Sequence, residues 1–259
     1  MSKAEMLKII ASIEAQLAQM KALLSTLPET VPVTAPVLRT EDTGKVFEMA
    51  CCLALNTPYK GNYKYSMEAA QKLATRLTKL PQLFPPCAHT AEKGCRYDYT
   101  GIERPEFHLS VKTTKRDGKV APQVIGQPKP KKFCDVIGIP FTDVPTLKAY
   151  IQANVKTVLP ALLSHTLDCD VIYYNDTKNT IKHIRLVKPI DWAAFEYEWT
   201  CDATSWKNSS TLKIKGGERS VPIVEFQFHS KSRSNMAIRW CFEEFLTQFR
   251  DHLAVEELK

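Results

Sequence analysis

The stretch that decides the fold is Arg96-Tyr97-Asp98-Tyr99, followed by Phe107-His108-Leu109-Ser110-Val111-Lys112-Thr113-Thr114. Apolar and polar side chains alternate in its second part, which predicts a strand from 107 to 113. Side chains two residues apart point to the same face of a strand, so Ser110 and Lys112 share a face. A buried, unpaired ammonium group is costly, and the pattern therefore predicts a carboxylate or a phosphate close to Lys112.

Asp98 and Lys112 are the residue types that phosphodiester hydrolysis requires. Carboxylate oxygens hold Mg²⁺, which polarises the phosphate and lowers the pKa of a bound water. A lysine beside them orients that water and offsets the negative charge of the transition state. Residues 42–55 are predicted to form a helix that starts at Asp42 or Thr43, and Glu48 on this helix is a candidate second carboxylate.

These features resemble the core of the restriction-endonuclease-like PD-(D/E)xK nucleases, over roughly residues 42 to 135. The resemblance implies that Asp98 is the metal-binding aspartate and Lys112 the motif lysine. It also implies that Glu48 is the acidic residue of the first helix, with Asp98 and Glu48 on the same metal. The expected activity is a sequence-specific endonuclease of the type II restriction kind. It would cut double-stranded DNA with Mg²⁺, for which Mn²⁺ substitutes.

The sequence departs from that family at Ser110, which stands where the second acidic residue of the motif is expected. Some members recruit a carboxylate from a helix instead, so activity would then depend on Glu48. Two alternatives stay open. The chain is a nuclease fold that has lost activity and only binds DNA, or it is a coiled-coil assembly protein whose basic surface is incidental.

Gln123 and Gln127 follow the predicted strand and are further candidate catalytic residues. A glutamine can orient water or a phosphate. The two residues are four apart and would share a face if the segment is helical. The competing interpretation is that both are solvated amides that flank a glycine turn.

Basic residues predict the DNA contacts. Clustered lysines and arginines neutralise phosphates without reading sequence, whereas arginine and asparagine can also bind base edges. Two strands, 221–229 and 236–242, are predicted to form a hairpin with a polar tip that reads DNA. The alternative is a structural hairpin whose basic residues pair with carboxylates. The candidate DNA-binding residues are Lys115, Arg116, Lys119, Lys131, Lys132, His229, Arg233, Asn235 and Arg239.

A heptad pattern marks the N-terminus. Apolar residues recur at alternating spacings of four and three, at Met6, Ile10, Ile13, Leu17, Met20, Leu24 and Leu27. This pattern favours a coiled coil over residues 1–27 and hence a homodimer, with an amphipathic helix packed on its own domain as the alternative. Residues 28–40 are rich in proline and predict an extended linker before a nuclease domain at 41–259.

The predicted fold class is α/β or α+β, with a mixed sheet flanked by helices. Further helices are expected at 66–80, closed by Pro81, at 144–166 with a kink at Pro160, and at 243–257. Further strands are expected at 169–174, 180–187 and 211–215.

Bulk composition limits the classes of protein. The 259 residues carry a formal net charge of +7, which favours polyanionic partners without proving them. No apolar run is long enough to span a bilayer and no secretory signal is evident, so an intracellular protein of the cytoplasm or nucleus is expected. The eight cysteines are expected to be reduced. Cys87, His89 and Cys95 lack a fourth ligand at a zinc-finger spacing, which makes zinc the less favoured interpretation.

Overall fold

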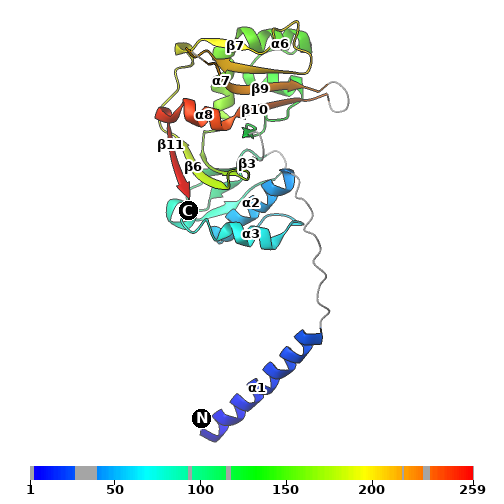
Figure 1. Ribbon diagram of the computed structural model, residues 1–259, viewed down its shortest axis with the longest axis vertical. Helices are drawn as coiled ribbons and strands as arrows, with labels where there is room; N and C mark the ends of the chain where they lie inside the picture. The colour runs from blue at the N-terminus through cyan, green and yellow to red at the C-terminus, as the bar shows by residue number, and fades with distance from the viewer. Residues whose placement is uncertain are drawn as a thin grey trace. The chain divides into compact units, whose positions relative to one another are not determined.

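The computed structural model describes residues 3–26, 40–92, 95–114, 118–217, 219–229 and 234–258. The chain divides into two units, Met1–Leu38 and Arg39–Lys259. The first unit contains one helix, α1 (Lys3–Thr26), drawn in blue in Figure 1. The predicted N-terminal helix is therefore confirmed, and the pairing of two such helices stays a prediction. The proline-rich part of the predicted linker lies outside the described residues.

The second unit is built on two sheets. The larger, sheet A, has the order β1-β2-β3-β5-β6-β11. All its neighbours are antiparallel except β3 and β5, which run parallel. Its strands are β1 (Cys87–His89), β2 (Tyr99–Gly101), β3 (His108–Thr114), β5 (Asp170–Asn175), β6 (Thr180–Leu186) and β11 (Leu253–Leu258). Strand β3, which carries Ser110 and Lys112, is thus an interior strand.

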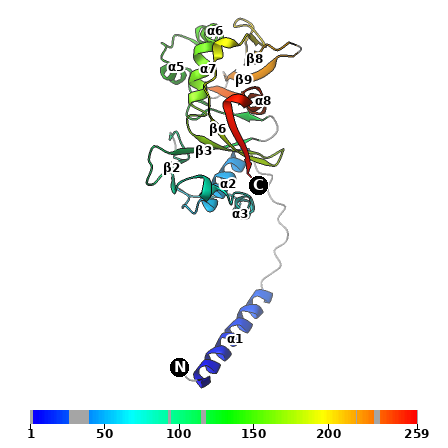
Figure 2. The ribbon, with the colours of Figure 1, turned by 90° about the vertical axis from the view of Figure 1, so that its left-hand side faces the viewer.

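Helix α2 (Thr40–Ala54) packs against β3, as Figures 1 and 2 show, and α3 (Met67–Ala74) lies beside it. The approach is close because Gly44 faces the Thr113 hydroxyl, which a Cβ at this glycine would meet at 3.4 Å. The buried Tyr99 hydroxyl donates a 2.7 Å hydrogen bond to the Glu48 carbonyl and ties α2 to β2. Short α4 (Leu80–Leu83) follows α3.

Sheet B is antiparallel throughout, with the order β4-β10-β9-β8-β7. Its strands are β4 (Lys119–Val120), β10 (Met236–Cys241), β9 (Val221–Phe228), β8 (Ser209–Ile214) and β7 (Tyr197–Trp199). One face, with Leu212, Val224, Phe226, Ile238 and Trp240, belongs to the main hydrophobic core. That core also takes residues from α5 (Pro130–Ile137), α6 (Val144–Ala153), α7 (Val155–Ser164) and α8 (Phe242–Gln248). The other face of sheet B is polar.

The mixed α/β class is confirmed, and the strands expected at 107–113, 169–174, 180–187, 211–215, 221–229 and 236–242 are found within two residues. Two helix predictions were wrong in detail. The helix at 66–80 ends at Ala74, and Pro81 lies in the first turn of α4. The helix at 144–166 breaks at Asn154, which ends α6 and precedes α7, while Pro160 lies inside α7.

The predicted closing helix at 243–257 was also wrong in its second half. Helix α8 ends at Gln248, and a 3-10 turn, Arg250–His252, leads into strand β11. This last strand pairs with β6 from Leu253–Leu186 to Leu258–Ile181 and forms the edge of sheet A. A 3-10 turn at Trp192–Ala194 precedes β7. Among the described residues, no helix is both long and apolar enough to cross a bilayer.

Candidate active site

The candidate site lies where the β2–β3 hairpin of sheet A meets the turn that follows β4 of sheet B. A polar hollow of about 370 Å³ opens there. Its lining residues are Cys95, Arg96, Asp98, Val111, Lys112, Thr113, Val120, Ala121, Pro122, Gln123 and Val124. The hollow therefore brings together three of the predicted catalytic residues, Asp98, Lys112 and Gln123, from two separate segments of the chain.

Asp98 is held by the hairpin backbone. Its N–H donates to the Leu109 carbonyl at 3.1 Å, and its Oδ2 accepts from the Val111 N–H at 2.7 Å. Burial raises the pKa of the Asp98 carboxyl, while the positive charge of Lys112 and the Val111 N–H act in the opposite direction. A carboxylate kept in this setting gains from a cation beside it, because a cation favours its charged form.

Lys112 and Ser110 share a face of β3, as predicted, and differ in their surroundings. Ser110 is fully buried and its Oγ accepts from Gln123 Nε2 at 2.5 Å. Lys112 is half-buried and lines the hollow. Within the described part of the chain, the Lys112 ammonium makes no hydrogen bond or ion pair. The predicted carboxylate partner is Asp98, whose charge interacts with it. Lys112 is thus free to bind an anion from solvent.

Gln123 is buried on a strained turn. Val124 has a φ of 62°, and the Ile125 N–H donates to the Gln123 carbonyl at 2.6 Å. A three-residue turn with positive φ at a β-branched residue is rare and costs on the order of 1–3 kcal/mol. Backbone bonds anchor the turn, since the Gln123 N–H donates to the His165 carbonyl at 2.6 Å. Among the residues that the structure describes, Gln123 Oε1 is buried without a hydrogen-bond partner. Such an orphaned acceptor is unusual and points to a missing ligand.

Gln127 does not join this site. The segment forms turns rather than a helix, so the two glutamines do not share a helical face as expected. Gln127 is exposed, while Gln123 is buried. Gly126 explains the tight path, because a Cβ there would lie 2.6 Å from Ala121 Cβ and 2.8 Å from the Pro122 carbonyl oxygen.

Glu48 is buried on α2 but does not line the hollow. Its Oε1 bonds to His89 Nε2 at 2.7 Å, and its Oε2 pairs with Lys45 Nζ at 2.7 Å. Burial acts to raise the pKa of Glu48, but the bonds from His89 and Lys45 outweigh it and the pKa is lowered. Glu48 also interacts electrostatically with Asp98. The binding of both carboxylates to one metal stays a prediction, and both oxygens of Glu48 are engaged by His89 and Lys45.

Zinc is not supported at Cys87, His89 and Cys95. His89 Nδ1 accepts from the Lys60 N–H at 2.8 Å, so Nε2 carries the proton and donates to Glu48. Both ring nitrogens are therefore occupied. Across the described residues, no group of three or more His, Cys, Asp or Glu side chains could hold a metal ion. The cysteines of the described chain are free thiols, as predicted.

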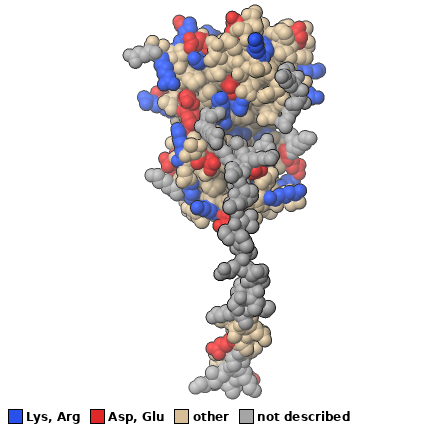
Figure 3. Space-filling model, turned by 45° about the vertical axis from the view of Figure 1, so that its right-hand side comes forward, with Lys and Arg blue, Asp and Glu red and all other residues tan. Residues whose placement is uncertain are grey.

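The predicted DNA-binding residues lie in several places. Lys115, Arg116 and Arg233 fall outside the described residues. Lys131 pairs with Asp135 at 3.1 Å on α5, next to the exposed Lys132. On the face in Figure 3, Lys and Arg are interspersed with Asp and Glu rather than gathered in one patch. These two lysines thus fit general phosphate contacts at most.

The remaining four lie on or near β4, β9 and β10. Lys119 and Arg239 both pair with Glu225, at 3.3 and 3.1 Å. The Asn235 carbonyl accepts from the N–H of the exposed His229 and closes the hairpin at 2.9 Å. This pairing agrees with the alternative in which the hairpin is structural and its basic residues pair with carboxylates.

Three features of the site carry no local sequence signal. Arg96 lines the hollow, with its Nη2 2.6 Å from the Ser164 carbonyl oxygen and 2.8 Å from Asp168 Oδ2. The Val124 turn and the burial of Glu225 likewise depend on residues more than ten positions away. Only the tertiary structure brings these partners together.

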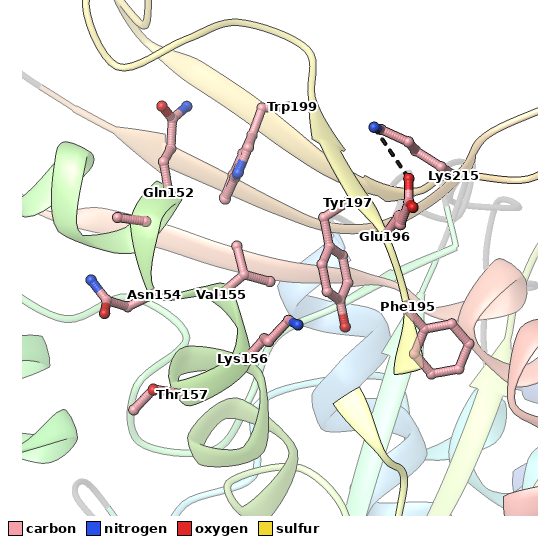
Figure 4. Close-up of a pocket in the computed structure, with 11 residues that line it drawn as sticks. Gln152, Asn154, Val155, Lys156, Thr157, Phe195, Glu196, Tyr197, Trp199 and Lys215 are labelled. Carbon is pink, nitrogen blue, oxygen red and sulfur yellow. Dashed lines mark hydrogen bonds and ion pairs between the residues drawn. The ribbon is translucent and has the colours of Figure 1, made fainter. Parts of the chain in front are cut away.

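A second hollow, of about 550 Å³, lies in the other part of the unit between the ends of α6 and α7 and strand β7 (Figure 4). Phe195, Tyr197 and Trp199 line one side of it. Its polar groups are paired within the chain. The Tyr197 hydroxyl donates to the Trp192 carbonyl at 2.7 Å, and Lys215 pairs with Glu196 at 3.5 Å. It lacks the free lysine and the orphaned acceptor of the first hollow.

The comparison with known proteins found similarity to a restriction enzyme. Over 223 residues the chain is 40% identical to the type II restriction enzyme CviAII of Paramecium bursaria Chlorella virus 1. The alignment covers 85% of this chain and 63% of that enzyme, so the chain spans less than two thirds of its relative. No family model matches the chain, and no solved structure matches it. The similarity confirms the resemblance to restriction-endonuclease-like nucleases.

Proposed function

We propose that this chain is a sequence-specific endonuclease that hydrolyses phosphodiester bonds of double-stranded DNA. The observation that carries the proposal is the meeting of Asp98, Lys112 and Gln123 in one polar hollow. The 40% identity to a type II restriction enzyme supports the same reaction and substrate. In this proposal α2 and strands β1, β2, β3 and β5 form the restriction-endonuclease-like core.

Lys112 would bind the scissile phosphate. Its ammonium lines the hollow and makes no bond within the described part of the chain. A fixed positive charge there offsets the negative charge that builds up on the phosphate oxygens during attack. Gln123 Oε1, buried and without a partner, would accept a hydrogen bond from the attacking water. Its bond to Ser110 and the strained turn hold that oxygen in place.

The oxygen donors at the hollow suit Mg²⁺, with Mn²⁺ as a substitute. Mg²⁺ binds one or two carboxylates together with phosphate oxygens and waters. Asp98 supplies the carboxylate, and Gln123 Oε1 is a neutral oxygen without another bond. Glu48 would add negative charge behind Asp98 and would become a ligand if its carboxylate turned from Lys45. When bound, the ion supplies charge for the phosphate and a more acidic water.

A homodimer through α1 is a further part of the proposal. The heptad side chains Met6, Ile10, Ile13 and Leu17 are exposed by 45–58%. An isolated helix with such an apolar stripe is marginal in water, and pairing two copies would bury it. Two active sites in one dimer would cut both strands of a duplex.

The test is incubation with supercoiled plasmid and Mg²⁺, beside samples with Mn²⁺ and with a chelator. We expect defined linear fragments with either metal and intact plasmid with the chelator. A protein that binds the plasmid but never cuts it would favour the inactive DNA-binding alternative, to which Ser110 and the engaged Glu48 already point.

Deleting residues 1–27 tests the dimer. We expect a monomer in light scattering and nicked circles in place of linear product. Full-length protein that runs as a monomer at micromolar concentration would refute the pairing and leave the cleavage assignment standing.

A further inference from the structure

The polar face of sheet B holds a charged cluster that the cleavage chemistry does not use. Glu225 on β9 is the cross-strand partner of Arg239 on β10, and their closest contact is 3.1 Å. Lys119 on β4 reaches the same Glu225 oxygen, Oε2, at 3.3 Å. Because side chains alternate along a strand, these residues point away from the core that Val224, Phe226 and Trp240 fill.

The cluster adjoins the candidate active site. Val120 pairs with Trp240, the residue after Arg239, and Ala121 already lines the hollow. Beyond it, the Ile238 N–H donates to the Gly126 carbonyl at 2.8 Å and fixes the Gln123 turn to β10. Strand β10, which carries Arg239, is thus tied to both segments that lead into the Gln123 turn, and we take a duplex in the hollow to extend along this strand.

The ion pairs do not satisfy this cluster. Lys119 and Arg239 both contact the one oxygen Glu225 Oε2, and among the described residues Arg239 Nε is buried without a hydrogen-bond partner. The contact therefore does not use the two-pronged geometry of an arginine–carboxylate pair. The Arg239 side chain is 35% exposed and that of Glu225 is 10% exposed. Arg239 therefore keeps a donor that a ligand with acceptor atoms could use.

We propose that Arg239 and Glu225 read a G·C base pair in the major groove, an inference that rests on the proposed endonuclease function. Guanine presents two acceptors there, N7 and O6, which match the arginine fork. Cytosine presents the N4 amino donor, which matches a carboxylate. A carboxylate beside the arginine would repel a phosphate, so the pair suits a base rather than the backbone.

Lys119 completes the arrangement as a positioning residue. With two cations and one carboxylate, the cluster keeps a net positive charge when Glu225 is ionised. Lys119 would hold Glu225 while Arg239 turns toward guanine. Without this hold, the carboxylate would follow the arginine and lose its place opposite cytosine.

The experiment uses a library of random duplexes, and the full-length protein is scored for both cut ends and bound sequences. Wild type is compared with Arg239→Lys, Glu225→Gln and the matched control Arg250→Lys, whose side chain is 81% exposed on a 3-10 turn. Preferred duplexes are then remade with 7-deazaguanine, which lacks the N7 acceptor. Circular dichroism checks that each variant folds.

We expect Arg239→Lys to lower kcat/KM on the preferred site by about 10- to 100-fold and to relax the preference at one G·C pair. Glu225→Gln should relax the cytosine preference of that same pair. The 7-deazaguanine penalty should appear with wild type and Arg250→Lys and vanish with Arg239→Lys.

Three results would overturn the inference. Unchanged sequence preference in Arg239→Lys would make the cluster structural. An equal loss on all sequences, with a reduced salt dependence, would make Arg239 a phosphate contact. A wild type that neither cuts nor selects any sequence would overturn the proposed function as well. A wild type that selects a G·C-containing sequence without cutting would overturn only the endonuclease function.

Discussion

Two carboxylates of the second unit, Glu243 and Asp98, differ in how their charges are satisfied. Glu243 at the start of α8 accepts hydrogen bonds from Tyr173, Asn175, Lys178 and Lys182 at 2.9 to 3.3 Å. Burial acts to raise its pKa, but these bonds outweigh it and lower the pKa to about 2. Asp98 has the opposite balance, and its pKa is raised.

The contrast separates an acid that the fold satisfies from one that we propose to be functional. Glu243 is satisfied by its own fold, so its charge stabilises the join between sheet A and α8. Asp98 lies in a hollow with a lysine that makes no bond among the described residues and with a buried amide oxygen that has no partner among them. Under the proposed function, a bound cation completes the surroundings of its charge. A raised pKa with a specific charged neighbour in a hollow is typical of functional sites.

The largest expected effect is that of Lys112→Ala on cleavage. Removing the ammonium should lower the cleavage rate by about 10²- to 10³-fold, because it withdraws a fixed charge from the transition state. The melting temperature should hardly change, since Lys112 makes no bond within the described chain. Plasmid cleavage and thermal unfolding measure the two quantities, with the exposed Lys72→Ala, on α3, as the matched control. Equal cleavage rates for wild type and Lys112→Ala would refute the role of Lys112 in cleavage, and with it the functional contrast between the hollow and Glu243.

Glu243→Gln should do the reverse, with a loss of stability and little change in cleavage. A depressed pKa in the folded state contributes stability that is present above the unfolded pKa of about 4.5 and is lost as pH falls toward 2. Discounted for partial exposure, the loss at pH 7 should be about 2 kcal/mol. Denaturant unfolding of wild type and variant should show a gap that is constant from pH 7 to 5 and shrinks between pH 5 and 2.

The exposed Glu103→Gln serves as the control for Glu243→Gln and should show no such gap. If Glu243→Gln instead abolished cleavage while the protein stayed folded, Glu243 would belong to the active site and the contrast with Asp98 would fail.

The sequence predicted the interior strand and its functional pair because both depend on local rules. Alternation placed Ser110 and Lys112 on one face of β3. The β2–β3 hairpin places Asp98 next to that strand, where its carboxylate accepts a hydrogen bond from the Val111 N–H. The same rules located most strands of sheet B. Local periodicity therefore predicted the part of the candidate site that lies on the β2–β3 hairpin.

What failed depended on partners distant in sequence. Residues 253–258 are amphipathic enough for a helix, but β6 offers a free edge and draws them into a strand. Gln123 and Gln127 were expected to act together, whereas anchoring of the turn to His165 and β10 buries one and exposes the other. That Glu48 shares a metal with Asp98 stays a prediction, but nothing in the sequence indicated that His89, 41 residues away, bonds to the Glu48 carboxylate. None of these partners can be read from the segment itself.

The smallest expected effect concerns the strain that fixes Gln123, and Val124→Gly tests it against Val187→Gly. Both substitutions remove a valine side chain and add conformational freedom to the unfolded chain, which costs about 1 kcal/mol. Val124 is the more buried of the two, so without strain its replacement should cost more than that of Val187, which is 53% exposed.

Glycine adopts a positive φ without strain, so at a φ of 62° it should recover about 1 kcal/mol or more. We therefore expect Val124→Gly to be the less destabilising variant in denaturant unfolding, and to cut DNA about 10-fold more slowly because Gln123 is no longer held. A larger loss of stability for Val124→Gly than for Val187→Gly would mean that the turn stores no strain. The surroundings of Asp98 and of Glu243 would then differ only in how the charge of each carboxylate is satisfied.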